Sequence, residues 1–145
     1  MKREIAVLLA LIIFTVGCTG CYDSRMGLSV DTIRNYEDIT AEETVRMFYY
    51  LWNRRDYKEL LDLIKKDSDF YYTMQDEQKI AEGDDSLRKN IQKIEIISIK
   101  KESRDQDGVV TYYVIWKGRS GRDETYFDLK RINNRWIITG STLYV

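Results

Sequence analysis

The fold class follows from one stretch near the C-terminus, which reads Phe127-Asp128-Leu129-Lys130-Arg131-Ile132-Asn133-Asn134-Arg135-Trp136-Ile137-Ile138. Asparagine tolerates positive φ, so Asn133-Asn134 is a suitable two-residue loop between two antiparallel strands. The pairing that this loop predicts joins Ile132 to Arg135, Arg131 to Trp136, Leu129 to Ile138 and Asp128 to Thr139. Because side chains alternate along each strand, one apolar face carries Phe127, Leu129, Trp136 and Ile138. The other face carries Tyr126, Asp128, Lys130 and Thr139.

The rest of the C-terminal half also has the composition of strands. Residues 94–100, 109–117, 124–132 and 135–139 are rich in β-branched and aromatic residues, and polar loops separate them. The second of these strands is apolar on both faces, with Val110, Tyr112, Val114 and Trp116 on one and Val109, Tyr113 and Ile115 on the other. Both faces of the sheet therefore need covering, which indicates a partner on the outer face.

Two helices are predicted before the strands. Thr40 and Glu43 fit a capping box, and Asp56 is a second N-cap with Glu59 three residues on. Apolar residues at helical spacing follow each cap: Val45, Phe48, Tyr49 and Trp52 in the first helix, and Tyr57, Leu60, Leu61 and Ile64 in the second. The first helix is apolar on most of its circumference, so we expect neighbours on several sides. Residues 76–85 are polar and acidic and are predicted to be loop. Helices followed by an antiparallel meander predict the α+β class.

The N-terminus has the pattern of a secretory signal. Lys2 and Arg3 precede an apolar run at residues 5–16, which is shorter than the roughly 20 residues that span a bilayer. The run ends on Thr15-Val16-Gly17-Cys18, which resembles the lipobox of bacterial lipoprotein precursors, although Thr15 stands where Leu is usual. The resemblance implies cleavage before Cys18 and acylation of that cysteine with palmitate-type chains.

The predicted organisation is a signal peptide at residues 1–17, a tether at 18–39 and a folded domain at 40–145. Within the tether, residues 29–33 are a candidate for a short element that packs on the domain. The predicted location is the extracytoplasmic face of the cell membrane, held by the lipid anchor. Two other interpretations stay open: an uncleaved transmembrane anchor, and an ordinary cleaved secretory signal.

The composition excludes several classes of site. The 145 residues include no histidine, so Ser-His-Asp, Cys-His and histidine-ligated metal sites are absent. Two cysteines are too few for a structural zinc site or a disulfide framework, and the acidic residues lack the spacing of a calcium loop. With 23 basic and 24 acidic residues the chain does not have the charge of a nucleic-acid binder. We therefore expect no cofactor, metal or nucleic acid.

The helical region resembles the opening of the nuclear transport factor 2-like superfamily in its run Glu43-Thr44-Val45-Arg46-Met47-Phe48-Tyr49-Tyr50-Leu51-Trp52-Asn53-Arg54-Arg55-Asp56-Tyr57-Lys58-Glu59-Leu60. The hairpin at residues 127–138, with Trp136 after the turn, is similar to the superfamily's last hairpin. The resemblance covers residues 40–145, and the chain also looks like the uncharacterised secreted lipoproteins that carry this domain. It implies a strongly curved antiparallel sheet wrapped around the N-terminal helices, often with a cone-shaped cavity.

Catalytic members of that superfamily place acids, tyrosines or histidines inside the cone. Here the inner hairpin face lacks a titratable group, since Asp128 is predicted to face outward and Asp56 to cap a helix. We expect a non-catalytic binding domain that takes a protein partner, a second copy of the chain through the sheet, or a small apolar ligand. The alternative is a small-molecule enzyme of the isomerase, cyclase or dehydratase type with a buried Asp or Tyr. The expected pocket lining is Phe48, Tyr49, Trp52, Trp116, Phe127, Leu129, Trp136 and Ile138.

Overall fold

The computed structural model describes residues 26–29, 32, 38–83, 93–104 and 107–143. Among these residues three helices precede the sheet, α3 (Ala41–Arg54), α4 (Tyr57–Asp62) and α5 (Asp69–Gly83). Four strands follow, β1 (Glu95–Arg104), β2 (Val110–Gly118), β3 (Gly121–Ile132) and β4 (Arg135–Ser141). The strands form one antiparallel sheet in the order β1-β2-β3-β4. The predicted α+β class is confirmed.

Both predicted helix starts are confirmed by their caps. The Thr40 hydroxyl accepts from the Glu43 amide at 3.2 Å, and the Glu43 carboxylate accepts from the Thr40 amide at 2.8 Å, which completes the capping box. The Asp56 carboxylate accepts from the Glu59 amide and begins α4. Between the two helices Arg55 adopts φ 57°, a left-handed conformation that ends α3.

The predicted loop at residues 76–85 is wrong over its described part, because α5 continues to Gly83. The Ser68 hydroxyl accepts from the Tyr71 amide at 3.1 Å and caps the start of this helix. Phe70, Met74 and Ala81 are buried along one side. The acidic and polar residues that suggested a loop form the exposed side instead, where they make contacts within the helix such as Lys79 with Asp76 at 2.8 Å.

The predicted C-terminal hairpin is confirmed from its turn to the pair Leu129 and Ile138. Asn133 and Asn134 both have positive φ, 49° and 66°, and Leu129 pairs with Ile138 as predicted. Beyond that pair the predicted match of Asp128 with Thr139 is wrong, since Asp128 pairs with Gly140. A β-bulge inserts Thr139 as an extra residue into β4, and a register drawn from the turn alone does not contain it.

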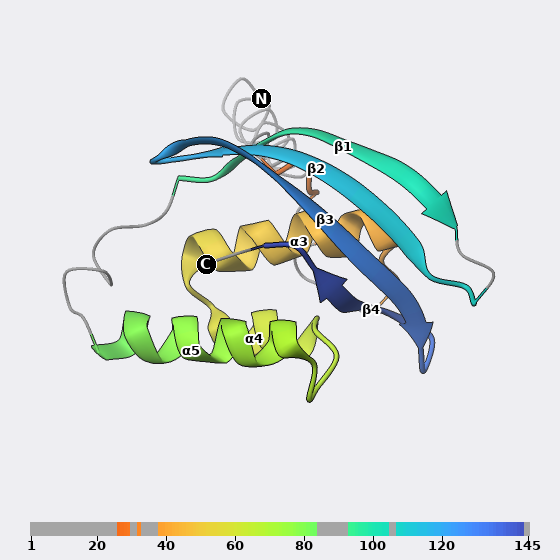
Figure 1. Cartoon of the computed structure of the whole chain (residues 1–145), viewed down its shortest axis with the longest axis horizontal. Coiled ribbons are helices and arrows are strands. Elements are labelled where there is room, and N and C mark those ends of the chain that lie inside the picture. Colours follow the sequence, from red (N-terminus) through yellow and green to blue (C-terminus); the bar gives the residue numbers. More distant parts are fainter. Residues whose placement is uncertain (1–25, 30–31, 33–37, 84–92, 105–106, 144–145) are drawn as a thin grey trace, which may run out of the picture.

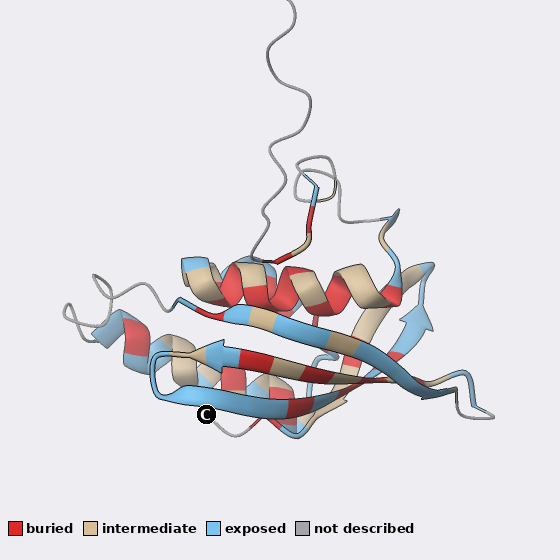
Figure 2. Ribbon diagram, turned by 90° about the horizontal axis from the view of Figure 1, so that it is seen from above, coloured by how far each residue is buried: buried red, intermediate tan, exposed pale blue. Residues whose placement is uncertain are grey.

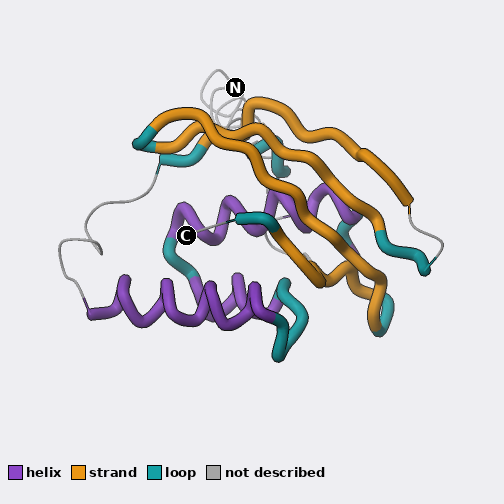
Figure 3. Tube along the Cα trace, in the orientation of Figure 1, coloured by secondary structure: helices purple, strands orange, loops and turns teal. Residues whose placement is uncertain are grey.

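The sheet arches over α3, with α4 and α5 below it (Figure 1). The tube in Figure 3 shows the same layering, helices on one side and strands on the other. The outer edge of β4 is covered, because Ile138 exchanges backbone hydrogen bonds with Leu63 and Lys65 at 2.8 Å each. The predicted burial of α3 on several sides is also confirmed, since eight of its residues are buried: Ala41, Thr44, Val45, Met47, Phe48, Tyr49, Leu51 and Trp52.

The folded unit begins before Thr40. Met26 and Leu28 are each 1% exposed and belong to the same core as α3 and the sheet. Figure 2 shows this short buried segment beside α3. The predicted tether at residues 18–39 therefore includes a packed element at 26–29, close to the candidate element at 29–33, of which only Ser29 and Thr32 are described.

Candidate functional site

The predicted pocket-lining residues come together on the concave side of the sheet. Phe48, Tyr49 and Trp52 project from α3, Trp116 from β2, Phe127 and Leu129 from β3, and Trp136 and Ile138 from β4. All of them are buried in the core except Trp136, which is half-buried and packs against it. The residues that were expected to line a pocket therefore lie together as part of the hydrophobic core.

The aromatic rings of this cluster contact one another. The Phe127 ring lies 5.2 Å from Phe48 and 5.7 Å from Tyr49, between ring centroids. Trp116 lies 6.0 Å from Tyr49 and 5.9 Å from Trp52. These separations are those of packed aromatic pairs, and none of these five side chains is more than 9% exposed. The rings fill the concave face as a core, so a ligand could enter here only by displacing them.

Buried polar groups lie at one end of the aromatic cluster. The Trp116 indole N–H donates to the Thr125 hydroxyl at 2.9 Å, with Thr125 itself 0% exposed. The Tyr49 hydroxyl and the Trp52 indole N–H are buried, and neither has a hydrogen bond of good geometry. Thr125, Phe127 and Leu129 are two residues apart along β3 and share its inward face, so the strand pattern alone predicts that Thr125 points inward.

Burial of the Tyr49 phenol raises its pKa well above the usual value, and the Asp123 carboxylate raises it further, while Thr125 acts in the opposite direction. The phenol therefore stays protonated at neutral pH. In that state it can donate a hydrogen bond but cannot act as a general base.

A second buried tyrosine lies where α3 meets α4. Tyr57 is 5% exposed, and its hydroxyl donates to the Glu77 carboxylate of α5 at 3.4 Å. Burial raises the pKa of Tyr57 to about 12, with a further contribution from Glu77. The same junction borders a groove of about 230 Å³, smaller than the roughly 300–1,000 Å³ of most small-molecule pockets. Its lining is Arg55, Asp56, Tyr57, Lys58, Gln78, Ala81 and Glu82.

The carboxylates lie outside the aromatic cluster. Asp128 is exposed, as predicted, and accepts from the Thr111 hydroxyl at 2.6 Å. Within the described residues the buried polar or charged side chains are Thr44 and Thr125. The same residues contain no group of three or more His, Cys, Asp or Glu able to hold a metal ion.

The outer face of the sheet exposes apolar surface. Tyr113 and Tyr126 pack side by side with ring centroids 4.9 Å apart, and Tyr126 is 45% exposed. A hydrogen bond to the Glu124 carboxylate is the main cause that raises the pKa of Tyr113 to about 12. Ile97 on β1 is 50% exposed. Of the apolar residues predicted on this face, Tyr113 and Ile115 on β2 and Val109 just before it are only half-buried.

The predicted lipid-attachment residue, Cys18, lies outside the described residues, as does the apolar run at 5–16. Among the helices that the structure describes, none has the length and apolar character needed to cross a bilayer.

Comparison with known proteins leaves the family open. No protein-family model matches the sequence, and no curated protein matches it either. A SEC-C motif containing protein from Rhodopseudomonas palustris, solved in solution, aligns with a TM-score of 0.47 at 13% identity over 89% of this chain and 96% of that chain. A similarity at this level says nothing about what this chain binds or does.

Proposed function

We propose that the protein is a lipoprotein anchored through Cys18 to the extracytoplasmic face of the cell membrane, with a binding domain that has no catalytic role. The observation that carries the anchor is the N-terminal sequence: Lys2 and Arg3, the apolar run at residues 5–16, and Gly17 before Cys18. Several acyl chains on one cysteine give stable attachment, which a single chain does not.

The anchor is tested by fractionation of cells that express the full chain. We expect the wild type in the membrane fraction and in the detergent phase after detergent partitioning, because the acyl chains drive it there. The Cys18→Ser variant should be lost from the detergent phase, whereas the matched variant Cys21→Ser should remain in it. Equal partitioning of the wild type and Cys18→Ser would exclude the lipid anchor.

We also propose that the domain is nuclear transport factor 2-like, with the sheet forming a cone around the helices. The curved four-stranded sheet, α3 on its concave side and the Asn133-Asn134 hairpin with Trp136 after it are consistent with that proposal. The filled concave face, in which Phe48 and Phe127 are both 0% exposed, fits a closed cone.

A binding role is supported by where the polar groups are. The concave face is apolar and aromatic, and its buried polar residue on β3 is a threonine, which is not a proton-transfer group at neutral pH. The exposed surface that a protein partner or a second copy would cover is the outer face with Tyr126 and Ile97. A small apolar ligand would have to enter the aromatic cluster.

The alternative, a small-molecule enzyme, is favoured by one observation: the Tyr49 hydroxyl is buried beside Thr125 without a hydrogen bond of good geometry. Such a phenol is an available donor for a substrate oxygen. Native mass spectrometry of the domain separates the candidates, because a second subunit or a retained apolar molecule supports binding. Loss of a retained polar molecule in Tyr49→Phe would instead support the enzyme.

A further inference from the structure

The segment at residues 26–29 is attached to the domain by its side chains. Met26 and Leu28 are each 1% exposed and are part of the main core, although they precede α3 by more than ten residues. Ser29, the next residue, is exposed. The side chains of Met26 and Leu28 are thus as deeply buried as the core residues of α3.

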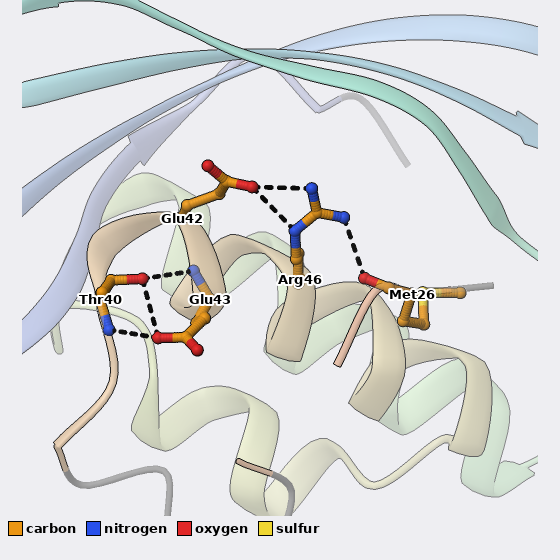
Figure 4. Close-up of polar contacts among 5 residues, drawn as sticks. All are labelled: Met26, Thr40, Glu42, Glu43 and Arg46. Carbon is orange, nitrogen blue, oxygen red and sulfur yellow. Dashed lines mark hydrogen bonds and ion pairs between the residues drawn. The ribbon is translucent and has the colours of Figure 1, made fainter. Parts of the chain in front are cut away.

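Its backbone is also held, by Arg46 on α3. One guanidinium nitrogen, Nη1, donates to the Met26 carbonyl oxygen at 3.0 Å (Figure 4). The other two, Nε and Nη2, donate to the Glu42 carboxylate at 3.0 and 2.7 Å. Glu42 lies one helical turn before Arg46, so the carboxylate orients the guanidinium toward the segment. Both of the bonds to Glu42 go to the same carboxylate oxygen, Oε1, and hydrogen bonds from a charged donor are stronger than neutral ones.

The position of this attachment limits how far the domain can move from Cys18. Met26 follows Cys18 by eight residues (26 − 18), and an extended chain spans at most about 3.3–3.6 Å per residue. The reach is therefore at most roughly 29 Å. Without the attachment the first fixed residue would be Ile39, which packs against the core and follows Cys18 by 21 residues (39 − 18), with a reach of roughly 76 Å.

We infer that residues 26–29 are a strap that holds the domain next to the bilayer. The inference rests on the proposed lipid anchor at Cys18. A strap at this position restricts the partner to a protein whose extracytoplasmic part lies close to the bilayer, within the distance that the residues between Cys18 and Met26 can span. The lipid headgroups themselves are not the partner, because the chain after Cys18 carries 21 basic and 23 acidic residues (23 − 2 and 24 − 1), which gives no attraction to anionic lipid.

Insertions on either side of the strap test it. The lipid-modified full chain carries Cys21→Ser and a donor dye on Lys130→Cys, an exposed site on β3, and is placed in vesicles with acceptor-labelled headgroups. Twenty Gly/Ser residues inserted between Ser24 and Arg25 should raise the root-mean-square tether length from about 16 to about 29 Å and lower the energy transfer. The same insertion between Tyr36 and Glu37 should leave it unchanged, because the strap is still attached. An equal response to both insertions would overturn the strap.

Thiol labelling tests the strap independently of the lipid. In a Cys18→Ser/Cys21→Ser background, which has no other cysteine, Met26→Cys should react about 100-fold more slowly than Ser29→Cys, since only the first side chain must wait for local opening. Equal rates would overturn the strap whatever the state of Cys18. If the rates differ as expected but the wild-type protein carries no acyl mass on Cys18, the proposed anchor fails and the packed segment remains.

Discussion

Replacement of Phe127 by alanine decides whether the concave face is a core or the lining of an open cavity. Phe127 is 0% exposed, and its ring contacts Phe48, Tyr49 and Phe70 at centroid distances of 5.2, 5.7 and 6.2 Å. Removing a ring from such a site loses its transfer free energy and leaves a cavity, which together cost about 3–5 kcal/mol. A domain of this size has about 5–15 kcal/mol in total, so Phe127→Ala should remain measurable but strongly destabilised.

The assay is urea unfolding of the chain without residues 1–21, which keeps the segment at 26–29. With a denaturant dependence of about 1–3 kcal/mol per molar, the midpoint should fall by one molar or more. Phe127→Leu keeps most of the volume and should lose less than about 2 kcal/mol, which gives a second reading if the alanine variant does not fold. Tyr126→Ala, at the exposed neighbouring position, should lose less than about 1 kcal/mol. If Phe127→Ala costs no more than Tyr126→Ala, the ring lines an open space and the filled core is refuted.

Three further changes test separate parts of the structure. Thr125→Val leaves the buried Trp116 indole N–H without its acceptor and should lower the free energy of unfolding by about 1–3 kcal/mol, measured in urea. The control Thr111→Val removes an exposed hydrogen bond and should lower it by less than half of that. Equal losses in the two variants would contradict the buried hydrogen bond. Leu28→Ala should cost about 2–5 kcal/mol and Ser29→Ala less than about 0.5 kcal/mol, so a negligible effect of Leu28→Ala would show that the segment does not pack. Tyr57 has a pKa raised to about 12 against about 10 in the unfolded chain, so the folded state holds the proton more tightly and stability is lost as the pH rises from about 10 to about 12. The midpoint of urea unfolding should therefore fall less steeply with pH across that range in Tyr57→Phe than in the wild type. An equal pH dependence in the two proteins would be inconsistent with the buried phenol.

Local signals account for the elements that the sequence predicted well. The capping box at Thr40 and Glu43, the Asp56 cap and the Asn133-Asn134 turn each depend on residues within a few positions of one another. Alternation along β3 placed Phe127 and Leu129 inward and Asp128 outward for the same reason. Such patterns contain the physical cause of the structure, so they predict it without tertiary information.

The elements that were missed depend on contacts distant in sequence. Helix α5 has a weak apolar stripe, and only the packing of Phe70 and Met74 against the rest of the core makes a helix of its polar sequence. Met26 and Leu28 are buried because α3 and Arg46 lie beside them, which the isolated apolar residues of a tether do not reveal. The bulge at Thr139 is likewise invisible to a register counted from the turn.

The intact mass of the protein extracted from membranes shows whether Cys18 carries the proposed lipid. We expect a chain that lacks residues 1–17 and carries the added mass of a diacylglycerol, with or without a further acyl chain, on Cys18. A membrane-derived chain that retains Met1, or that begins at Cys18 without acyl mass, would contradict it.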